Sequence, residues 1–167
     1  VLVGPRMLAS EGAIYPLSTD RFFNPFDIFQ PFSGAGVKAV NTETNRRGDG
    51  VFALDSYGAV YKAGAAEVLN VSSTYFGWDI ARDLEITNDD QGLYVLDGYG
   101  VLHARGTASM LKSVFFGWDI ARDVELNPSG QGGVVLDGYG GIHINGNTRP
   151  LELFDAPYFG WDIARDL

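Results

Sequence analysis

An internal repeat of about 40 residues constrains the fold of this chain more than any other feature. The letters FGWDIARDL occupy residues 76–84 and again 159–167, and FGWDIARDV occupies 116–124. Between these copies, segments 50–64, 92–106 and 132–146 align without gaps, and a more divergent copy lies at 4–17. Such a chain folds as a series of equivalent units that bury their apolar faces against one another.

Each aligned segment predicts a tight β-hairpin. In 132–146, two apolar, β-branched runs flank the letters DGYG at 137–140. Glycine supplies the positive φ that such a turn needs, and the aspartate accepts backbone N–H groups. Segment 80–86, IARDLEI, alternates in the manner of a further strand. We expect an outer strand after the hairpin, at 66–71 or 151–154, so that a unit has three or four strands.

These units predict an all-β, four-bladed β-propeller, because this period with this strand number is typical of propeller blades. Segment 163–167 matches the first strand of a unit, and the segment that begins the chain matches the second strand. We therefore expect the C-terminal strand to pair with the N-terminal blade and close the ring. The expected blades are 163–167 with 1–31, then 32–74, 75–114 and 115–157.

The repeated GWDIARD and LDGYG motifs resemble those of repeat-rich propeller domains in secreted bacterial proteins. The resemblance covers nearly the whole chain and is strongest over the third and fourth blades. It implies an extracellular or cell-surface interaction module and assigns no catalytic residues.

Composition narrows the possible partners. The 167 residues carry a formal net charge of −9, which opposes binding to nucleic acid and to anionic membranes. The sequence lacks an apolar run long enough to predict membrane insertion. It also contains no cysteine, which excludes disulfides and thiolate metal ligands.

Repeated aspartates suggest a cation site, and Ca²⁺ is the ion considered because it prefers oxygen ligands. Asp79, Asp119 and Asp162 occupy equivalent positions in the repeats. The alternative is that each caps a turn or pairs with an arginine; the arginines in question are Arg82, Arg122 and Arg165. We expect His103 and His143 to pack within blades rather than bind metal, because tyrosine takes their place in other copies. The chain is predicted to need no cofactor.

Aromatic residues supply the candidate contacts. We expect Trp78, Trp118 and Trp161 to pack between blades, whereas Tyr57, Tyr99 and Tyr139 are candidate exposed contacts beside the turns. The N-terminal phenylalanines would form an adhesive patch if exposed; they are Phe22, Phe23, Phe26 and Phe29. Asn70-Val71-Ser72 is an N-glycosylation sequon, which would make the protein a glycoprotein.

Two functions stay open at this stage. The first is a non-enzymatic structural module that self-associates into a homo-oligomer, extracellular fibre, surface layer or tandem array. The second is a lectin-like or calcium-dependent domain that binds glycans. We find no nucleophile–base pair or phosphate loop in the sequence and expect no enzymatic activity.

Overall fold

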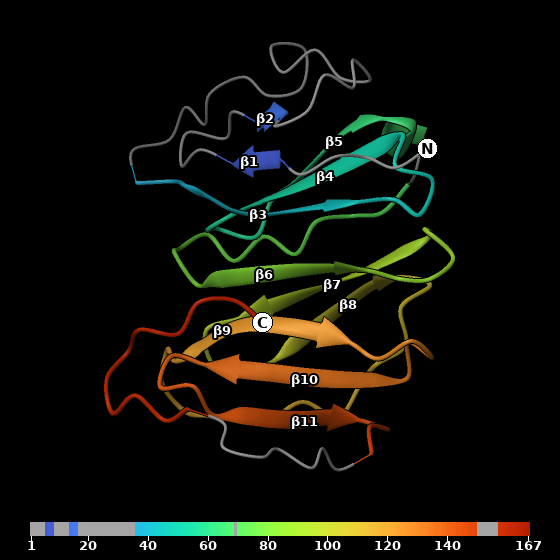
Figure 1. The fold of residues 1–167 in the computed structure, drawn as a ribbon. Coiled ribbons are helices and arrows are strands. Elements are labelled where there is room, and N and C mark those ends of the chain that lie inside the picture. Colours follow the sequence, from blue (N-terminus) through green and yellow to red (C-terminus); the bar gives the residue numbers. More distant parts are fainter. Residues whose placement is uncertain (1–5, 9–13, 17–35, 69, 150–156) are drawn as a thin grey trace.

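The computed structural model of the 167-residue chain describes residues 6–8, 14–16, 36–68, 70–149 and 157–167. These residues form three antiparallel three-stranded sheets and one two-stranded hairpin, with a single turn of 3-10 helix (Figure 1). The all-β class predicted from the repeats is therefore confirmed. No helix in the described part of the chain is long and apolar enough to cross a membrane.

Each three-stranded sheet is a simple meander in which the middle strand of the sequence is also the middle strand of the sheet. The hairpin pairs β1 (Arg6–Leu8) with β2 (Ile14–Pro16). The sheets contain β3 (Ala39–Thr44), β4 (Gly50–Asp55) and β5 (Val60–Gly64); β6 (Ala81–Ile86), β7 (Gly92–Asp97) and β8 (Leu102–Gly106); and β9 (Ala121–Leu126), β10 (Gly132–Asp137) and β11 (Ile142–Gly146).

The pairing register is the same in all four copies of the hairpin. Leu96 lies opposite Leu102 in the second sheet, and Leu8 lies opposite Ile14 in the N-terminal hairpin. The equivalent pairs in the other sheets are Leu54 with Val60 and Leu136 with Ile142. The divergent N-terminal copy therefore keeps the hairpin geometry of the repeats, although its sequence has changed.

The apolar core lies between successive sheets. Strands β4 and β7 are buried along their whole length, and β7 is buried because the first and third sheets pack against its two faces. One cluster joins the first sheet to the second through Phe52, Leu54, Ala81, Leu84, Leu93 and Val95. A second joins the second sheet to the third through Tyr94, Leu96, Leu102, Ala121, Val124 and Val135. Each sheet thus depends on its neighbours for most of its buried surface.

A repeated backbone contact fixes how each sheet sits on the preceding one. The carbonyl of Gly98, in the β7–β8 turn, accepts the N–H groups of Ile120 and Ala121 at 2.8 and 2.9 Å. The carbonyl of Ser56 does the same for Ile80 and Ala81. This contact brings the first strand of each sheet, here called the inner strand, beside the preceding inner strand, so β3 contacts β6 and β6 contacts β9.

Two expectations about the outline of the blades change. The expected outer strand at 66–71 is wrong: Ala65–Val68 forms a turn of 3-10 helix, and residues 70 and 71 belong to no strand. The alternative at 151–154 lies outside the described residues. Within those residues there are three three-stranded sheets, β1 pairs with β2 alone, and 163–167 belongs to no sheet. A closed ring is therefore not part of the described structure.

Candidate recognition surface

The three repeated tryptophans lie on the surface, and the expectation that they pack between blades is wrong. Trp78, Trp118 and Trp161 are 49%, 62% and 67% exposed. They precede the inner strands, in a bend where the glycine before each of them has a positive φ. The strand alternation that buries alternate side chains therefore does not reach them.

Other aromatic rings join the tryptophans at the hairpin-turn end of the sheets. Tyr99 lies between Trp78 and Phe115, with 6.1 Å between ring centroids on each side. Tyr57 and Tyr139 make the equivalent contacts with Tyr75 and Tyr158. We call this set the aromatic surface; it comprises Tyr57, Tyr75, Trp78, Tyr99, Phe115, Trp118, Tyr139, Tyr158 and Trp161. The three predicted contact tyrosines belong to it and are half-buried.

Backbone hydrogen bonds hold each aromatic segment at both ends. The N–H of Phe116 donates to the carbonyl of Tyr99 at 2.8 Å, and the N–H of Ile120 donates to Gly98 at 2.8 Å. Between these anchors, Gly117 turns the chain with a φ of 79°. Phe115 and Trp118 are both exposed. Because the hydrogen bonds of Phe116 and Ile120 hold the segment, these two rings project from a fixed backbone.

In the first two aromatic segments, the phenylalanine directly before the glycine packs inward, away from the aromatic surface. Phe116 packs edge-on against His143, with 4.7 Å between centroids, and Phe76 packs in the same way against His103 at 4.9 Å. In the pairs Tyr75–Phe76 and Phe115–Phe116 the first ring is therefore exposed and the second is packed into the fold, whereas Phe159 of the third pair is 46% exposed. That division explains why the sequence repeats two aromatic residues in succession at this point.

The hairpin turns are organised by their aspartates, as the sequence predicts. Asp97 Oδ1 accepts the N–H groups of Tyr99 and Val101 at 2.9 and 3.0 Å, while Oδ2 lies 2.8 Å from His103 Nε2. Asp137 makes the same contacts with His143. In the first sheet the hydroxyl of Tyr61 donates to Asp55 instead. Histidine and tyrosine alternate here because both reach the carboxylate of the turn, so packing within the blade accounts for the histidines.

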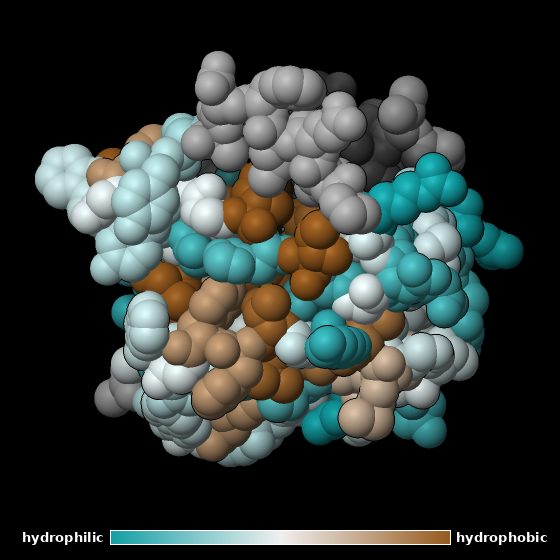
Figure 2. Space-filling view, turned by 90° about the horizontal axis from the view of Figure 1, so that it is seen from below, coloured by the Kyte–Doolittle hydropathy of each residue, from teal (hydrophilic) through white to brown (hydrophobic). Residues whose placement is uncertain are grey.

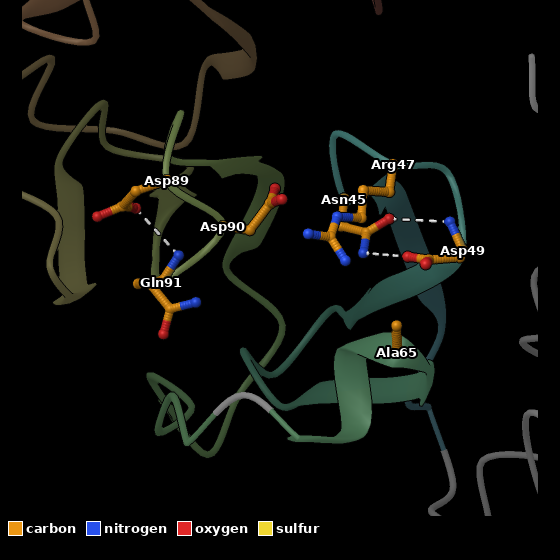
Figure 3. A pocket seen from close by; sticks show the side chains of 7 residues that line it. All are labelled: Asn45, Arg47, Asp49, Ala65, Asp89, Asp90 and Gln91. Atoms are coloured by element: carbon orange, nitrogen blue, oxygen red, sulfur yellow. Dashed lines mark hydrogen bonds between the residues drawn. The ribbon is translucent and has the colours of Figure 1, made fainter. Parts of the chain in front are cut away.

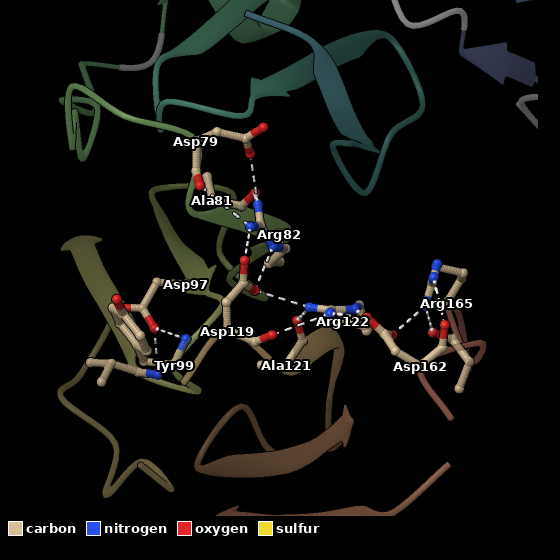
Figure 4. Close-up of polar contacts among 12 residues, drawn as sticks. Asp79, Ala81, Arg82, Asp97, Tyr99, Asp119, Ala121, Arg122, Asp162 and Arg165 are labelled. Carbon is tan, nitrogen blue, oxygen red and sulfur yellow. Dashed lines mark hydrogen bonds and ion pairs between the residues drawn. The ribbon is translucent and has the colours of Figure 1, made fainter. Parts of the chain in front are cut away.

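The aspartates considered as cation ligands belong to a ladder of ion pairs (Figure 4). Arg82 bridges Asp79 and Asp119, and Arg122 bridges Asp119 and Asp162. Arg165 then pairs with Asp162 at 2.7 Å. Arg82 and Arg122 thus each link the aspartate of their own copy to that of the next copy, whereas Arg165 pairs with the aspartate of its own copy.

The ion pairs of the ladder lower the pKa of Asp119 and of Asp162. Burial acts to raise the pKa of Asp119, but the hydrogen bonds and charges of Arg82 and Arg122 outweigh it and hold this pKa below its ordinary value. Hydrogen bonds and charges of Arg122, followed by those of Arg165, lower the pKa of Asp162. Among the described residues, no group of three or more His, Asp and Glu side chains is arranged to hold a metal ion. The alternative pairing with arginine is the arrangement that forms.

A second set of acidic side chains lies along the inner strands. Burial, with repulsion from Glu125, Asp123 and Asp166, raises the pKa of Glu43 to about 7. Burial also raises the pKa of Glu85 to about 8, with repulsion from Glu43 and Glu125. Glutamates at equivalent positions of β3, β6 and β9 therefore face one another, a relationship that the sequence alone does not reveal.

Carboxylates also bond from one inner strand to the next. Asp83 Oδ2 accepts the N–H of Val124 at 2.9 Å, and Asn41 donates to Asp83 Oδ1. Burial, with repulsion from Asp123, raises the pKa of Asp83 well above its ordinary value. Asp83 therefore joins β6 to β9 through a buried carboxyl group that holds its proton more tightly than an ordinary aspartate.

At the opposite end of the sheets, a shallow polar pocket of about 290 Å³ lies between the first two sheets (Figure 3). Its carboxylates are already engaged: Asp49 accepts from Asn45, and Asp89 accepts from Thr87, Gln91 and Thr107. On the face that carries β11, apolar side chains gather toward the middle and polar ones lie around them (Figure 2).

Two predictions remain, the N-terminal phenylalanine patch and the glycosylation site. Phe22, Phe23, Phe26 and Phe29 lie outside the described residues. Asn70 is exposed, as a glycosylation acceptor must be. No family model, curated protein or solved structure that was compared with this chain matches it.

Proposed function

We propose that this protein is a non-enzymatic interaction module, built as a four-bladed β-propeller, whose aromatic surface is its recognition site. One observation carries the recognition role: successive repeats present the same large aromatic side chains to solvent at the same end of the sheets. Burying such a side chain stabilises a fold by about 1.5–3 kcal/mol. A cluster left exposed on a rigid backbone is typical of an interaction surface.

The four-bladed ring is supported by two identical peptides in different surroundings. The nonapeptides 76–84 and 159–167 have the same sequence, and Ile163 and Ala164 donate to Gly138 as Ile120 and Ala121 donate to Gly98. Yet Ile163 is 50% exposed, whereas its equivalent Ile80 is 2% exposed. These observations support the proposal that segment 163–167 takes the inner-strand position of a fourth sheet, whose other strands would cover its apolar side chains.

The hairpin β1–β2 supplies the missing strands of that sheet. It keeps the register of the other hairpins, and no inner strand precedes it among the described residues. Repulsion from Asp166 contributes to the raised pKa of Glu43, which supports placing 163–167 and β3 around a common centre. We propose that 163–167 pairs with β1 and completes the fourth blade.

The recognition role is tested by removing the exposed rings. The triple variant with Trp78, Trp118 and Trp161 changed to alanine should keep the melting temperature of the wild type within a few degrees, because exposed side chains contribute little to folding. The matched control is Leu84→Ala, at a side chain that is 0% exposed, which should cost about 2–5 kcal/mol. A triple variant as unstable as the control would mean that the rings serve the fold, and would refute the proposal.

A second candidate function is self-association through the same segment, into a homo-oligomer or fibre. It is favoured by Leu167, which is 46% exposed although its equivalents Leu84 and Val124 are 0% exposed. If 163–167 of one copy completed the blade of another, the contacts would run head to tail and propagate. Pairing within one chain has the advantage of a high effective concentration, so we expect the closed monomer to dominate in dilute solution.

Cysteine cross-linking separates the two arrangements, because the natural chain contains no cysteine. Leu84 faces Val95 and Val124 faces Val135, so the repeat register places Leu167 opposite Met7. Oxidising a variant with Met7→Cys and Leu167→Cys should give a disulfide within the monomer for a closed ring, and covalent chains for head-to-tail assembly. The control variant combines Leu8→Cys with Leu167→Cys, whose side chains would point to opposite faces of the sheet. Equal cross-linking in both variants, or none in either, would contradict the pairing.

A further inference from the structure

We propose that the aromatic surface binds a neutral polysaccharide, with pyranose rings stacked on the exposed aromatic faces. The inference rests on the proposed recognition role and names the chemical class of its ligand. A pyranose has an apolar face of C–H groups and a rim of hydroxyls. Its recognition therefore needs flat aromatic rings beside groups that accept hydrogen bonds.

The rings are accessible and already in place. An added Cβ at Gly117 or Gly160 would meet no heavy atom within 4 Å, so the space beside Trp118 and Trp161 is open. The backbone anchors at Phe116 and Ile120 fix the segment that carries Phe115 and Trp118. A rigid aromatic side chain loses little conformational entropy on binding, which favours affinity for an uncharged ligand.

A carboxylate follows each tryptophan directly in the sequence. Asp79, Asp119 and Asp162 follow Trp78, Trp118 and Trp161 directly, and each carboxylate is partly exposed. An ionised carboxylate has about four acceptor positions, so acceptor capacity remains for ligand hydroxyls after the arginine contacts.

The charge pattern selects an uncharged ligand. The arginines of the ladder neutralise the aspartates beside the rings, so the aromatic surface offers neither a cationic nor an anionic patch. The chain as a whole has a formal net charge of −9, which repels nucleic acid and acidic polysaccharides. A neutral polymer rich in hydroxyls is the ligand that this combination of rings and paired charges fits.

The repetition of the site favours a polymer over a single sugar. Aromatic residues recur at 75, 115 and 158 and tryptophan at 78, 118 and 161, so one molecule presents several similar sites on a rigid frame. Sites that are weak one by one add to a much higher avidity when a repeating ligand engages several of them.

The test is affinity electrophoresis through gels that contain cellulose derivatives, xylan, mannan, soluble starch or glycol chitin, with a gel without polysaccharide as reference. We expect at least one neutral polymer to retard the wild-type protein and to change its tryptophan fluorescence. Trp118→Ala should weaken that binding on the order of tenfold, as for a central aromatic contact. The triple tryptophan variant should migrate as in the reference gel.

The matched control is Met110→Ala, which removes an apolar side chain that is 93% exposed and lies outside the aromatic surface; it should bind like the wild type. Failure of every neutral polymer to retard the wild type would overturn the polysaccharide assignment, as would unchanged binding by the folded triple variant. These outcomes leave the recognition role itself to the stability test, because a wild type that binds no polysaccharide, together with a stable triple variant, would refute the ligand class alone.

Discussion

The backbone N–H of Leu167 donates to Asp123 Oδ2 at 2.9 Å, and this bond repeats the one from Val124 to Asp83, also at 2.9 Å. The bond from Val124 joins an aspartate of β6 to the backbone of β9, and the bond from Leu167 joins the equivalent aspartate of β9 to the backbone of the C-terminal segment. The last residues of the chain therefore follow the same rule as the interior repeats, although they have no paired strand among the described residues.

Replacing Asp123 with alanine should release the end of the chain without unfolding the sheets. The Leu167 amide would lose its acceptor, whereas Ile163 and Ala164 would keep theirs at Gly138. Hydrogen exchange measured by NMR should become faster at Leu167 alone within this segment. Asp123→Asn retains an oxygen acceptor and serves as the control. Equal loss of protection along 163–167 would show that the whole segment depends on Asp123.

Gly100→Ala should destabilise the protein more than Gly117→Ala. Both glycines have a positive φ, 92° and 79°, so both substitutions incur the backbone cost of about 1–2 kcal/mol. At Gly100 the new Cβ would also lie 2.8 Å from the ring of Phe116, which adds about 1–3 kcal/mol of overpacking, whereas Gly117 has open space. Denaturant unfolding measures the difference, and equal midpoints with equal slopes would contradict the close packing of Phe116.

Stability should be greatest in mildly acidic solution and should fall as the pH rises toward 9. Folding raises the pKa of Glu43 from 4.5 to about 7 and that of Glu85 from 4.5 to about 8. Between pH 4.5 and 8 the folded state therefore binds more protons than the unfolded state, and stability declines across this window. Melting temperatures recorded from pH 5 to pH 9 should follow that decline.

Glu85→Gln is the control for this pH dependence, because glutamine resembles the protonated acid and cannot ionise. Above pH 6, the melting temperature of the variant should fall less steeply with rising pH than that of the wild type. Below about pH 4 stability should instead fall as the pH falls. The pKa values of Asp119 and Asp162 are lower in the folded state than in the unfolded state, so protonation favours unfolding and removes their ion pairs. A wild-type melting temperature that rises from pH 5 to pH 9 would contradict the assignment.

The ion pair between Arg122 and Asp162 should contribute a measurable coupling between the third sheet and the C-terminal segment. A double-mutant cycle with alanine at both positions should give about 1 kcal/mol, discounted because the aspartate is partly exposed. The coupling should weaken in 1 M salt, where exposed charges are screened. A coupling of zero at low salt would mean that the C-terminal segment is held by its backbone bonds alone.

The local parts of this fold can be predicted from the sequence because their causes are local. The turn at 137–140 combines a positive φ, 92° at Gly140, with an aspartate that caps its own turn, and both needs are visible in the letters DGYG. The pairing of Asp119 with Arg122 follows from their spacing and is one of the two alternatives that the sequence offers.

Contacts between residues that are far apart in the sequence cannot be predicted from such local patterns. The exposure of Trp118 depends on the direction of a bend that lies before the strand, and alternation along a strand says nothing about a bend. The glutamates at 43 and 85 meet only because the inner strands lie side by side. The succession of two aromatics before Gly117 is the signal that could have identified the exposed surface, since only one of them can point inward.

The arginine ladder has a consequence for how such a chain can lengthen. Arg82 and Arg122 each contact the aspartate of their own copy and that of the next copy, so a new copy brings both halves of the contact that it needs. Duplication of one gene segment of about 40 codons would therefore create a compatible neighbour in a single event, without compensating substitutions elsewhere. The unit of inheritance and the unit of packing coincide in this chain.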